Sequence, residues 1–364
     1  MLGLMYANGE GCGKDTAEFL KWIRRAAKNG HASAMFNLAC AYRNGIGVVV
    51  DQREASQWLN KAAESGCAEA QCYLGNMYRL GQGVEKDFGV AMKWYLKSAN
   101  SGNAEAMRWI AGMYFSGEGV EKDWKSMFMW TEKGAKAGDA TCMNNLGLCY
   151  IEGWGTPKDR DKAIFWCEKV AVMGEFWAMY RLGNLYRDTN DPRARSWYAK
   201  AAEQEKFGSI ACVALGKLYL EGISGPQNDE MAKAMFAKSA QAGNKEGAYN
   251  LAWMYANGRG GAQNYSLALF WYKKAADGNH AIAENNLGVM YMDGKGVGKN
   301  AYTAKYWLER SMEHGNSKAP YNLGILYQDG RLGVRDIAEA RRLYKIAEQR
   351  GAASASKKLA EIGR

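Results

Sequence analysis

A short signature, Leu-Gly-x-x-Tyr, returns along the whole chain at a nearly constant spacing of 36 residues. The signature, or a variant with Ala in its second place, begins at ten positions: Leu2, Leu38, Leu74, Ile110, Leu146, Leu182, Leu215, Leu251, Leu287 and Leu323. A period of this length is typical of a solenoid, in which each unit packs only against its neighbours. The sequence therefore predicts one repeat domain over residues 1–364 rather than several globular domains.

Each unit carries the punctuation of two short helices. Gly-x-Gly pairs such as Gly81 and Gly83 follow the signature, and residues suited to a helix N-cap come next, at Asp15, Asp51, Asp87, Asp123, Asp159, Asp229, Asn264, Asn300 and Asp336. Apolar residues recur at helical spacing, as at Ala34, Leu38 and Tyr42, and no stretch alternates with period two. We therefore predict an all-α fold, a right-handed αα superhelix of about ten 36-residue helix-turn-helix repeats.

Three places depart from the regular repeat. The chain opens on the signature itself, so the first repeat is truncated. An irregular repeat near 182–214 spans 33 residues and lacks the glycine turn; Pro192 there suits the first turn of a helix, with Asp191 as its cap. At the other end, residues 353–364 are expected to form a helix that caps the hydrophobic end of the stack.

Together these motifs resemble the Sel1-like repeat (SLR) family, a relative of the tetratricopeptide repeats. The matching motifs are Ala-x-x-x-Leu-Gly-x-x-Tyr, Gly-x-Gly-Val, Asp, Lys-Ala-x-x-Trp-Tyr and Lys-Ala-Ala-x-x-Gly, and they cover nearly the whole chain in register. Members of this family are typically adaptors and scaffolds. The resemblance implies a non-catalytic protein-interaction scaffold of bacterial type, in host interaction, envelope assembly or neutralisation of a secreted toxin, with no cofactor.

No set of residues indicates a catalytic or metal site. The histidines, His31, His280 and His314, lie in loops between units, far apart along the chain, where exposed or capping roles are expected. No Cys-x-x-Cys pair occurs. Cys142 and Cys149 fall in one predicted helix, about 10 Å apart along its axis, which is too far for a disulfide. We therefore expect neither enzyme activity nor a bound metal, and reduced, partly buried cysteines.

The chain is basic, with 48 Lys plus Arg against 38 Asp plus Glu and a net charge of +10. Its basic residues form only doublets, so a nucleic-acid partner is not expected. No apolar run approaches the roughly 18 to 20 residues of a membrane-spanning helix. The compartment is left open: unpaired cysteines favour a reducing, cytoplasmic environment, while the half-repeat at Leu2 leaves room for an export leader upstream.

Binding residues can be predicted by position, because tetratricopeptide geometry places them five and two before, and two and five after, the signature Leu on the first helix of each unit. These columns change from unit to unit while the Leu, Gly and Tyr columns do not, and they hold many of the aromatic and Arg residues that dominate interfaces. The candidate protein-binding residues are Phe36, Arg43, Arg79, Arg108, Phe115, Trp177, Tyr180, Arg187, Tyr249, Trp253 and Tyr321. The arginines predict a protein partner with an acidic segment or a carboxylate terminus.

Other interpretations of the same columns stay open. The aromatic residues would also suit simple packing between adjacent helices. An enzyme or glycan-processing factor would use acidic groove residues such as Glu69, Glu105 and Glu246, but these lie in different repeats at no spacing that pairs them. An RNA-binding solenoid would need a repeated base-reading pair, which the columns lack.

Overall fold

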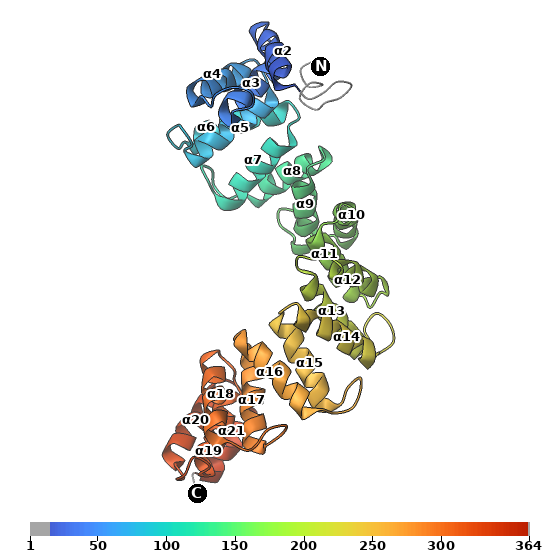
Figure 1. Cartoon of the computed structure of the whole chain (residues 1–364), viewed down its shortest axis with the longest axis vertical. Helices are drawn as coiled ribbons and strands as arrows, with labels where there is room; N and C mark the ends of the chain where they lie inside the picture. The colour runs from blue at the N-terminus through green and yellow to red at the C-terminus, as the bar shows by residue number, and fades with distance from the viewer. Residues whose placement is uncertain (1–14, 363–364) are drawn as a thin grey trace. The chain divides into compact units, whose positions relative to one another are not determined.

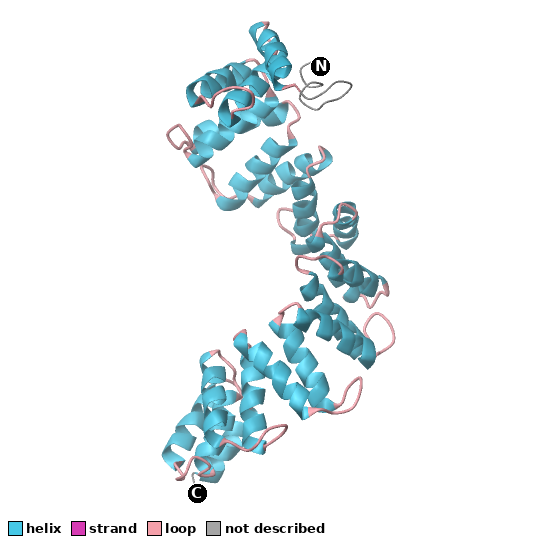
Figure 2. Ribbon diagram, viewed as in Figure 1, coloured by secondary structure: helices cyan, strands magenta, loops and turns pink. Residues whose placement is uncertain are grey.

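The computed structural model describes residues 15–362, which form twenty α-helices and no strand (Figures 1 and 2). The predicted all-α fold is therefore confirmed for this part of the chain. Helices that follow one another in sequence pack together within two compact units, residues 1–174 and 175–364. The first signature, at Leu2, lies outside the described residues. A single functional domain over the whole chain stays a prediction.

The described part of unit 1 begins with α2 and continues as four helical hairpins. Its helices are α2 (Thr16–Lys28), α3 (Ala32–Asn44), α4 (Gln52–Glu64), α5 (Ala68–Leu80), α6 (Phe88–Asn100), α7 (Ala104–Ser116), α8 (Trp124–Lys136), α9 (Ala140–Glu152) and α10 (Arg160–Ala171). The odd-numbered members are the first helices of the repeats, and the even-numbered members are the second helices.

Unit 2 contains five hairpins and a final helix. Its helices are α11 (Phe176–Arg187), α12 (Arg193–Ala202), α13 (Gly208–Glu221), α14 (Asp229–Gln241), α15 (Lys245–Asn257), α16 (Tyr265–Asp277), α17 (Ala281–Asp293), α18 (Ala301–Glu313), α19 (Ala319–Gln328), α20 (Ile337–Gln349) and α21 (Ala353–Ile362). The last helix packs on α20, where the sequence places a terminal cap.

Helix ends follow the local residues. Asp51 accepts backbone hydrogen bonds from Arg53 and Glu54 at 3.0 Å and so caps α4, while Gly45 ends α3 at φ 70°, a conformation that costs glycine little. One predicted cap is wrong. Asn228 caps α14, because its side chain accepts from Met231 N, and Asp229 is the first residue of that helix.

The signature glycine has a packing cause. A Cβ at Gly75 would lie 2.5 Å from the ring of Tyr95, and one at Gly216 would lie 2.6 Å from the ring of Phe236. The first helix therefore has to be bare where the aromatic residue of the second helix presses against it. The Leu beside each of these glycines is buried, as Leu74 is, so the constant columns of the repeat are those that form the core.

The irregular repeat closes its turn without glycine. Asn190 takes the left-handed conformation at φ 57°, and the Asp191 carboxylate accepts from Arg193 N at 2.9 Å, as predicted for a cap. The following helix, α12, has ten residues instead of thirteen. Its repeat then ends at Phe207, which adopts φ 70° where most units have glycine, a conformation that strains a bulky side chain.

Candidate protein-binding grooves

Eight of the eleven predicted residues line four open cavities beside the first helices. In unit 1 these are a cavity of about 50 Å³ at Phe36 and Arg43 and one of about 360 Å³ at Arg108 and Phe115; in unit 2 they are one of about 370 Å³ at Tyr180 and Arg187 and one of about 520 Å³ at Tyr249 and Trp253. The predicted columns thus border recesses within each unit. A binding role for these residues stays a prediction.

The other three predicted residues lie in stacks between side chains. The Trp177 ring lies 5.5 Å from Phe207, and the Tyr321 ring lies 5.7 Å from Tyr344. Arg79 lies over the ring of Trp109, at 4.3 Å from its centroid. These contacts fit the alternative in which such residues pack within the solenoid.

Arginines of one repeat lie on aromatic rings of the next. Arg43 lies 4.6 Å above the centroid of Tyr73, in the same relation as Arg79 to Trp109. The two rings were missed by position-based prediction because they stand directly before the signature hydrophobic residue, a column that was not considered. The signal was an Arg five places after one signature and an aromatic residue one place before the next.

Most predicted binding arginines already have carboxylate partners within the chain. The pairs are Arg79–Glu118 at 3.6 Å, Arg108–Glu105 at 3.3 Å, Arg108–Asp139 at 3.7 Å and Arg187–Asp188 at 2.8 Å. Arg43 differs, because its Nε donates to Asn44 Oδ1 at 3.2 Å and no carboxylate pairs with it among the described residues.

The larger unit-1 cavity, here called the unit-1 pocket, lies between α7, α8 and α9. Its lining includes Arg108, Trp109, Gly112, Phe115, Leu148 and Trp154. Phe115 is 49 % exposed, its ring centroid lies 6.2 Å from that of Trp154, and the Trp124 ring lies 5.6 Å from both. The lining is thus largely apolar, with one charged side chain at its edge.

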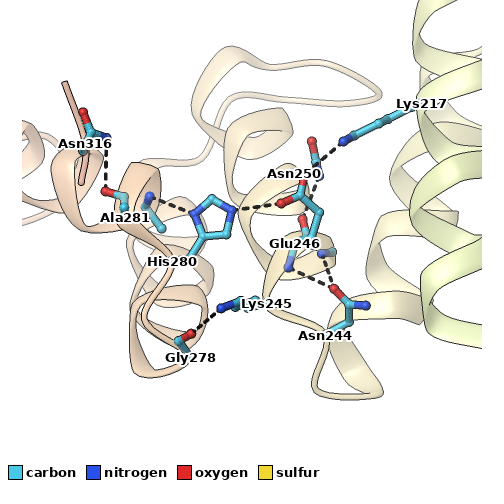
Figure 3. Close-up of polar contacts among 11 residues, drawn as sticks. Lys217, Asn244, Lys245, Glu246, Asn250, Gly278, His280, Ala281 and Asn316 are labelled. Atoms are coloured by element: carbon cyan, nitrogen blue, oxygen red, sulfur yellow. Dashed lines mark hydrogen bonds and ion pairs between the residues drawn. The ribbon is translucent and has the colours of Figure 1, made fainter. Parts of the chain in front are cut away.

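In unit 2 a polar network centred on Glu246 connects three consecutive first helices (Figure 3). Lys217 Nζ of α13 donates to Glu246 Oε1 at 2.9 Å, and His280 Nε2 lies 3.0 Å from Glu246 Oε2. The imidazole Nδ1 accepts from Ala283 N, so His280 caps α17 as expected of a loop histidine. The hydrogen bond with His280, reinforced by Lys217, lowers the pKa of the Glu246 carboxyl to about 2.

A second carboxylate is buried in unit 2 and was not predicted. Glu284 on α17 is fully buried. Its oxygens lie 3.1 Å from Arg310 Nη2 and 2.8 Å from His314 Nδ1. Arg310 lies in α18, the second helix of the same hairpin, and His314 is the C-cap of that helix. It stands three residues before Leu287, in a column that holds mostly Met, Cys or Ala in other units. A charge in an apolar column was the available signal.

The three glutamates considered for catalysis are held by neighbouring side chains. Glu69 Oε2 lies 3.2 Å from Cys67 Sγ, and Glu105 accepts from the Trp109 indole at 3.2 Å, while Glu246 is bound by Lys217 and His280. No group of three His, Cys, Asp or Glu within residues 15–362 could hold a metal ion.

The cysteines and the helix lengths bear on two further expectations. Cys142 and Cys149 are buried free thiols, and burial raises the pKa of Cys149 to about 11. Such protonated thiols are poor nucleophiles. None of the helices between residues 15 and 362 is both long and apolar enough to cross a membrane.

Comparison with known proteins supports the repeat assignment. The model of the Sel1 repeat matches ten segments: residues 1–31, 32–67, 68–103, 104–139, 140–174, 178–206, 209–244, 245–280, 281–316 and 317–351. A search of curated proteins finds no match to the chain. The register of the ten segments follows the signature read from the sequence, including the short repeat.

Solved structures give the same answer. A protective antigen present in uropathogenic Escherichia coli strains, which displays an SLR fold, is 30% identical, with a TM-score of 0.65 over 100% of this chain and 86% of that one. A Sel1 repeat protein from Oxalobacter formigenes is 26% identical, with a TM-score of 0.72 over 84% of this chain and 90% of that one. The chain belongs to the Sel1 repeat family, whose members are α-solenoid scaffolds for protein interaction.

Proposed function

We propose that this chain is a non-catalytic scaffold that binds a protein or peptide partner along its first helices. The observation that carries the proposal is the relation between sequence variation and position. Columns that stay constant between repeats are buried, as Leu74 and Leu251 are, whereas the variable columns border open cavities in both units. Because these side chains vary between repeats without changing the fold, they can be selected for contact with a partner.

Of the three roles expected from the family, host interaction has the most support. The protective antigen of uropathogenic Escherichia coli is 30% identical and aligns over the whole chain. An immunity protein from Pseudomonas aeruginosa is 18% identical with a TM-score of 0.31, which carries no argument for toxin neutralisation. We therefore propose a bacterial-type scaffold whose partner is met in host interaction.

An acidic segment of the partner is proposed to meet the chain at Arg43. This guanidinium is oriented by the Tyr73 ring and has no carboxylate partner in the described chain. At Arg79, Arg108 and Arg187 an acidic partner would have to displace an internal carboxylate first. Substitution of Arg43 by Glu is thus expected to weaken the binding of an acidic segment more than substitution of Arg79.

The groove of unit 2 can be tested with the full chain as bait in an affinity capture read by mass spectrometry. The groove variant combines Trp253→Ala, Tyr249→Ala and Arg187→Glu. A control variant, Phe270→Ala with Tyr306→Ala, removes two exposed aromatic rings, 49% and 52% exposed, from the second helices, whereas the rings of Tyr249 and Trp253 are half-buried. Circular dichroism establishes that both variants are folded.

The expected result is at least one protein captured by the wild type and by the second-helix variant but lost with the groove variant. Equal capture by all three chains would contradict binding through the unit-2 groove. Loss with the second-helix variant alone would place the binding surface on the second helices instead.

A further inference from the structure

One residue that lines the unit-1 pocket is a glycine, Gly112. This glycine lies in the middle of α7, and a Cβ built there would meet no atom within 4 Å. Every other glycine within the described helices has a neighbour inside that distance, such as the Tyr95 ring at Gly75. Close packing and backbone conformation therefore give no reason for glycine at this position, although glycine inside a helix is unfavourable relative to alanine.

The same column is filled in other repeats. Two residues after the signature stand Leu148 in the next unit-1 repeat and Trp253 in unit 2. Gly112 adds no side chain to the lining of the unit-1 pocket, a recess of about 360 Å³ that is open to the outside. A cavity of this size lies at the lower end of the range for sites that bind ligands.

The walls of the pocket are held in place before anything binds. Two guanidinium groups lie near the Trp109 ring, those of Arg79 at 4.3 Å and Arg108 at 5.4 Å from its centroid, and the indole N–H donates to Glu105 at 3.2 Å. The Trp154 ring lies 5.6 Å from the Trp124 ring. A rigid recess loses little conformational entropy when it is occupied, which favours binding.

The charges around the unit-1 pocket indicate which type of charged group a bound partner would carry there. Arg108 is the one charged residue that lines the pocket, and two carboxylates, Glu105 and Asp139, pair with its single positive charge. Glu105 is the accessible one, at 51% exposure against 12% for Asp139. With Arg79, which lies over Trp109 and pairs with Glu118, the ion pairs around the pocket join two arginines to three carboxylates, a balance of one negative charge that complements a basic group on a partner.

We infer that the unit-1 pocket receives one bulky apolar side chain of a protein partner, with Lys or Arg next to it in the partner sequence. The inference rests on the proposed scaffold function and names the chemistry of one anchor. Gly112, Phe115 and Asn145 line the pocket and are exposed to solvent. The backbone of a partner can therefore lie over the opening while one of its side chains enters the recess. Apolar anchors in preformed recesses are typical hot spots of interfaces.

A random dodecapeptide library displayed on phage provides the probe, selected against the immobilised full chain. Gly112→Leu adds an apolar side chain to the lining of the recess, at a site where its Cβ would meet no atom within 4 Å, so the variant is expected to fold. Val289→Leu changes the same column in unit 2 and serves as the matched control. Affinities of the selected peptides, synthesised with a fluorescent label, are then measured by anisotropy on all three chains.

Peptides selected on the wild type are expected to share Trp, Phe or Leu next to Lys or Arg, and to bind Gly112→Leu at least about thirtyfold more weakly but Val289→Leu unchanged. Glu105→Gln keeps an acceptor for the Trp109 indole but removes one negative charge. It should weaken the binding of these peptides relative to the wild type, and this difference should grow as the salt concentration is lowered. Selection of no such motif, or equal affinity for Gly112→Leu and the wild type, would overturn the inference. The unit-2 capture experiment is unaffected by either outcome, so failure of the pocket and failure of the scaffold function are distinguishable.

Discussion

Unit 1 and unit 2 use the same positions of the repeat for opposite purposes. Two residues after the signature, Gly112 contributes no side chain to the recess that it lines in unit 1, whereas Trp253 contributes a large ring to the cavity that it lines in unit 2. Five residues before the signature, Glu105 bonds within its own helix, to Arg108 and Trp109, whereas Glu246 reaches Lys217 and His280 of the neighbouring first helices.

This difference shows what a repeat scaffold permits. The constant columns form the core in both units, so side chains in the variable columns can change from recess to protrusion, or from apolar to ionic, without altering the backbone. In unit 1 the recess at Gly112 has a largely apolar lining. In unit 2 the Glu246 network joins neighbouring first helices, and a second carboxylate, Glu284, is fully buried. The two units are therefore expected to respond differently to substitution and to pH.

The largest effect is expected at the buried charge of unit 2. Glu284→Ala leaves Arg310 and His314 without their shared carboxylate and should lower the free energy of unfolding by about 3 kcal/mol, the usual cost of breaking a buried ion pair. Urea unfolding followed by circular dichroism measures it. Glu309→Ala, which removes a surface pair with Lys305, should cost less than about 1 kcal/mol. Equal costs for the two variants would show that burial of Glu284 contributes nothing special.

Glycines of unit 1 should respond with opposite signs. Gly75→Ala puts a Cβ against the Tyr95 ring and should destabilise by about 2 kcal/mol through overpacking. Gly112→Ala meets open space and should stabilise by up to about 1 kcal/mol through helix propensity. Thermal unfolding of both variants against the wild type checks the prediction. A loss of stability in Gly112→Ala would mean that its recess serves the fold rather than a partner.

Acid should weaken the Glu246 network of unit 2. The pKa of this carboxyl is about 2 in the folded chain, below the ordinary value of 4.5, so its contribution to stability is present above about pH 4.5 and is lost as the pH falls towards 2. The effect should stay within about 1 kcal/mol, because the side chain is 41% exposed and water screens it. Carboxyl NMR of Glu246 measures the titration directly. His280→Gln should raise this pKa, and titration of the wild type near 4.5 would contradict the assignment.

The smallest effect is expected from the arginine stack on the wall of the unit-1 pocket. Arg79→Ala removes the cation above Trp109 and its pair with Glu118, and should destabilise by about 0.5 to 1 kcal/mol. Arg79→Lys keeps the charge and should recover part of this loss. Tryptophan fluorescence and thermal unfolding report both. An unchanged melting temperature together with an unchanged emission spectrum would show that the stack does not hold the ring.

The sequence predicts the elements well because their signals are local. The Asp51 cap and the Gly45 stop act on backbone groups within a few residues, and the first helix they flank follows a period that is visible in one unit. The one wrong cap, Asp229, stands next to Asn228, and either side chain is chemically able to cap. The register of the repeat distinguishes them: Asn228 stands thirteen residues after Leu215, the same offset as Asp51 from Leu38, and Asp229 stands one residue further on.

Predicting the site was harder because its partners are remote in sequence. Eight of the eleven residues predicted from the columns, such as Arg108 and Tyr249, border cavities, since helical spacing decides which side of a helix a residue faces, and their binding role stays a prediction. The columns did not indicate that Arg108 is already paired, nor that two arginines lie near the Trp109 ring.

By itself, the sequence determined the number of repeats, the register of each helix and the buried columns, because a 36-residue period repeats the same local interactions ten times. Only the tertiary structure decided which variable positions become a recess, a stack or a buried ion pair. Glu246 and His280 are 34 residues apart, and whether their side chains meet depends on how one hairpin rests on the next. In the sequence, Gly112 does not reveal a pocket; the side chains that surround it in the structure form one.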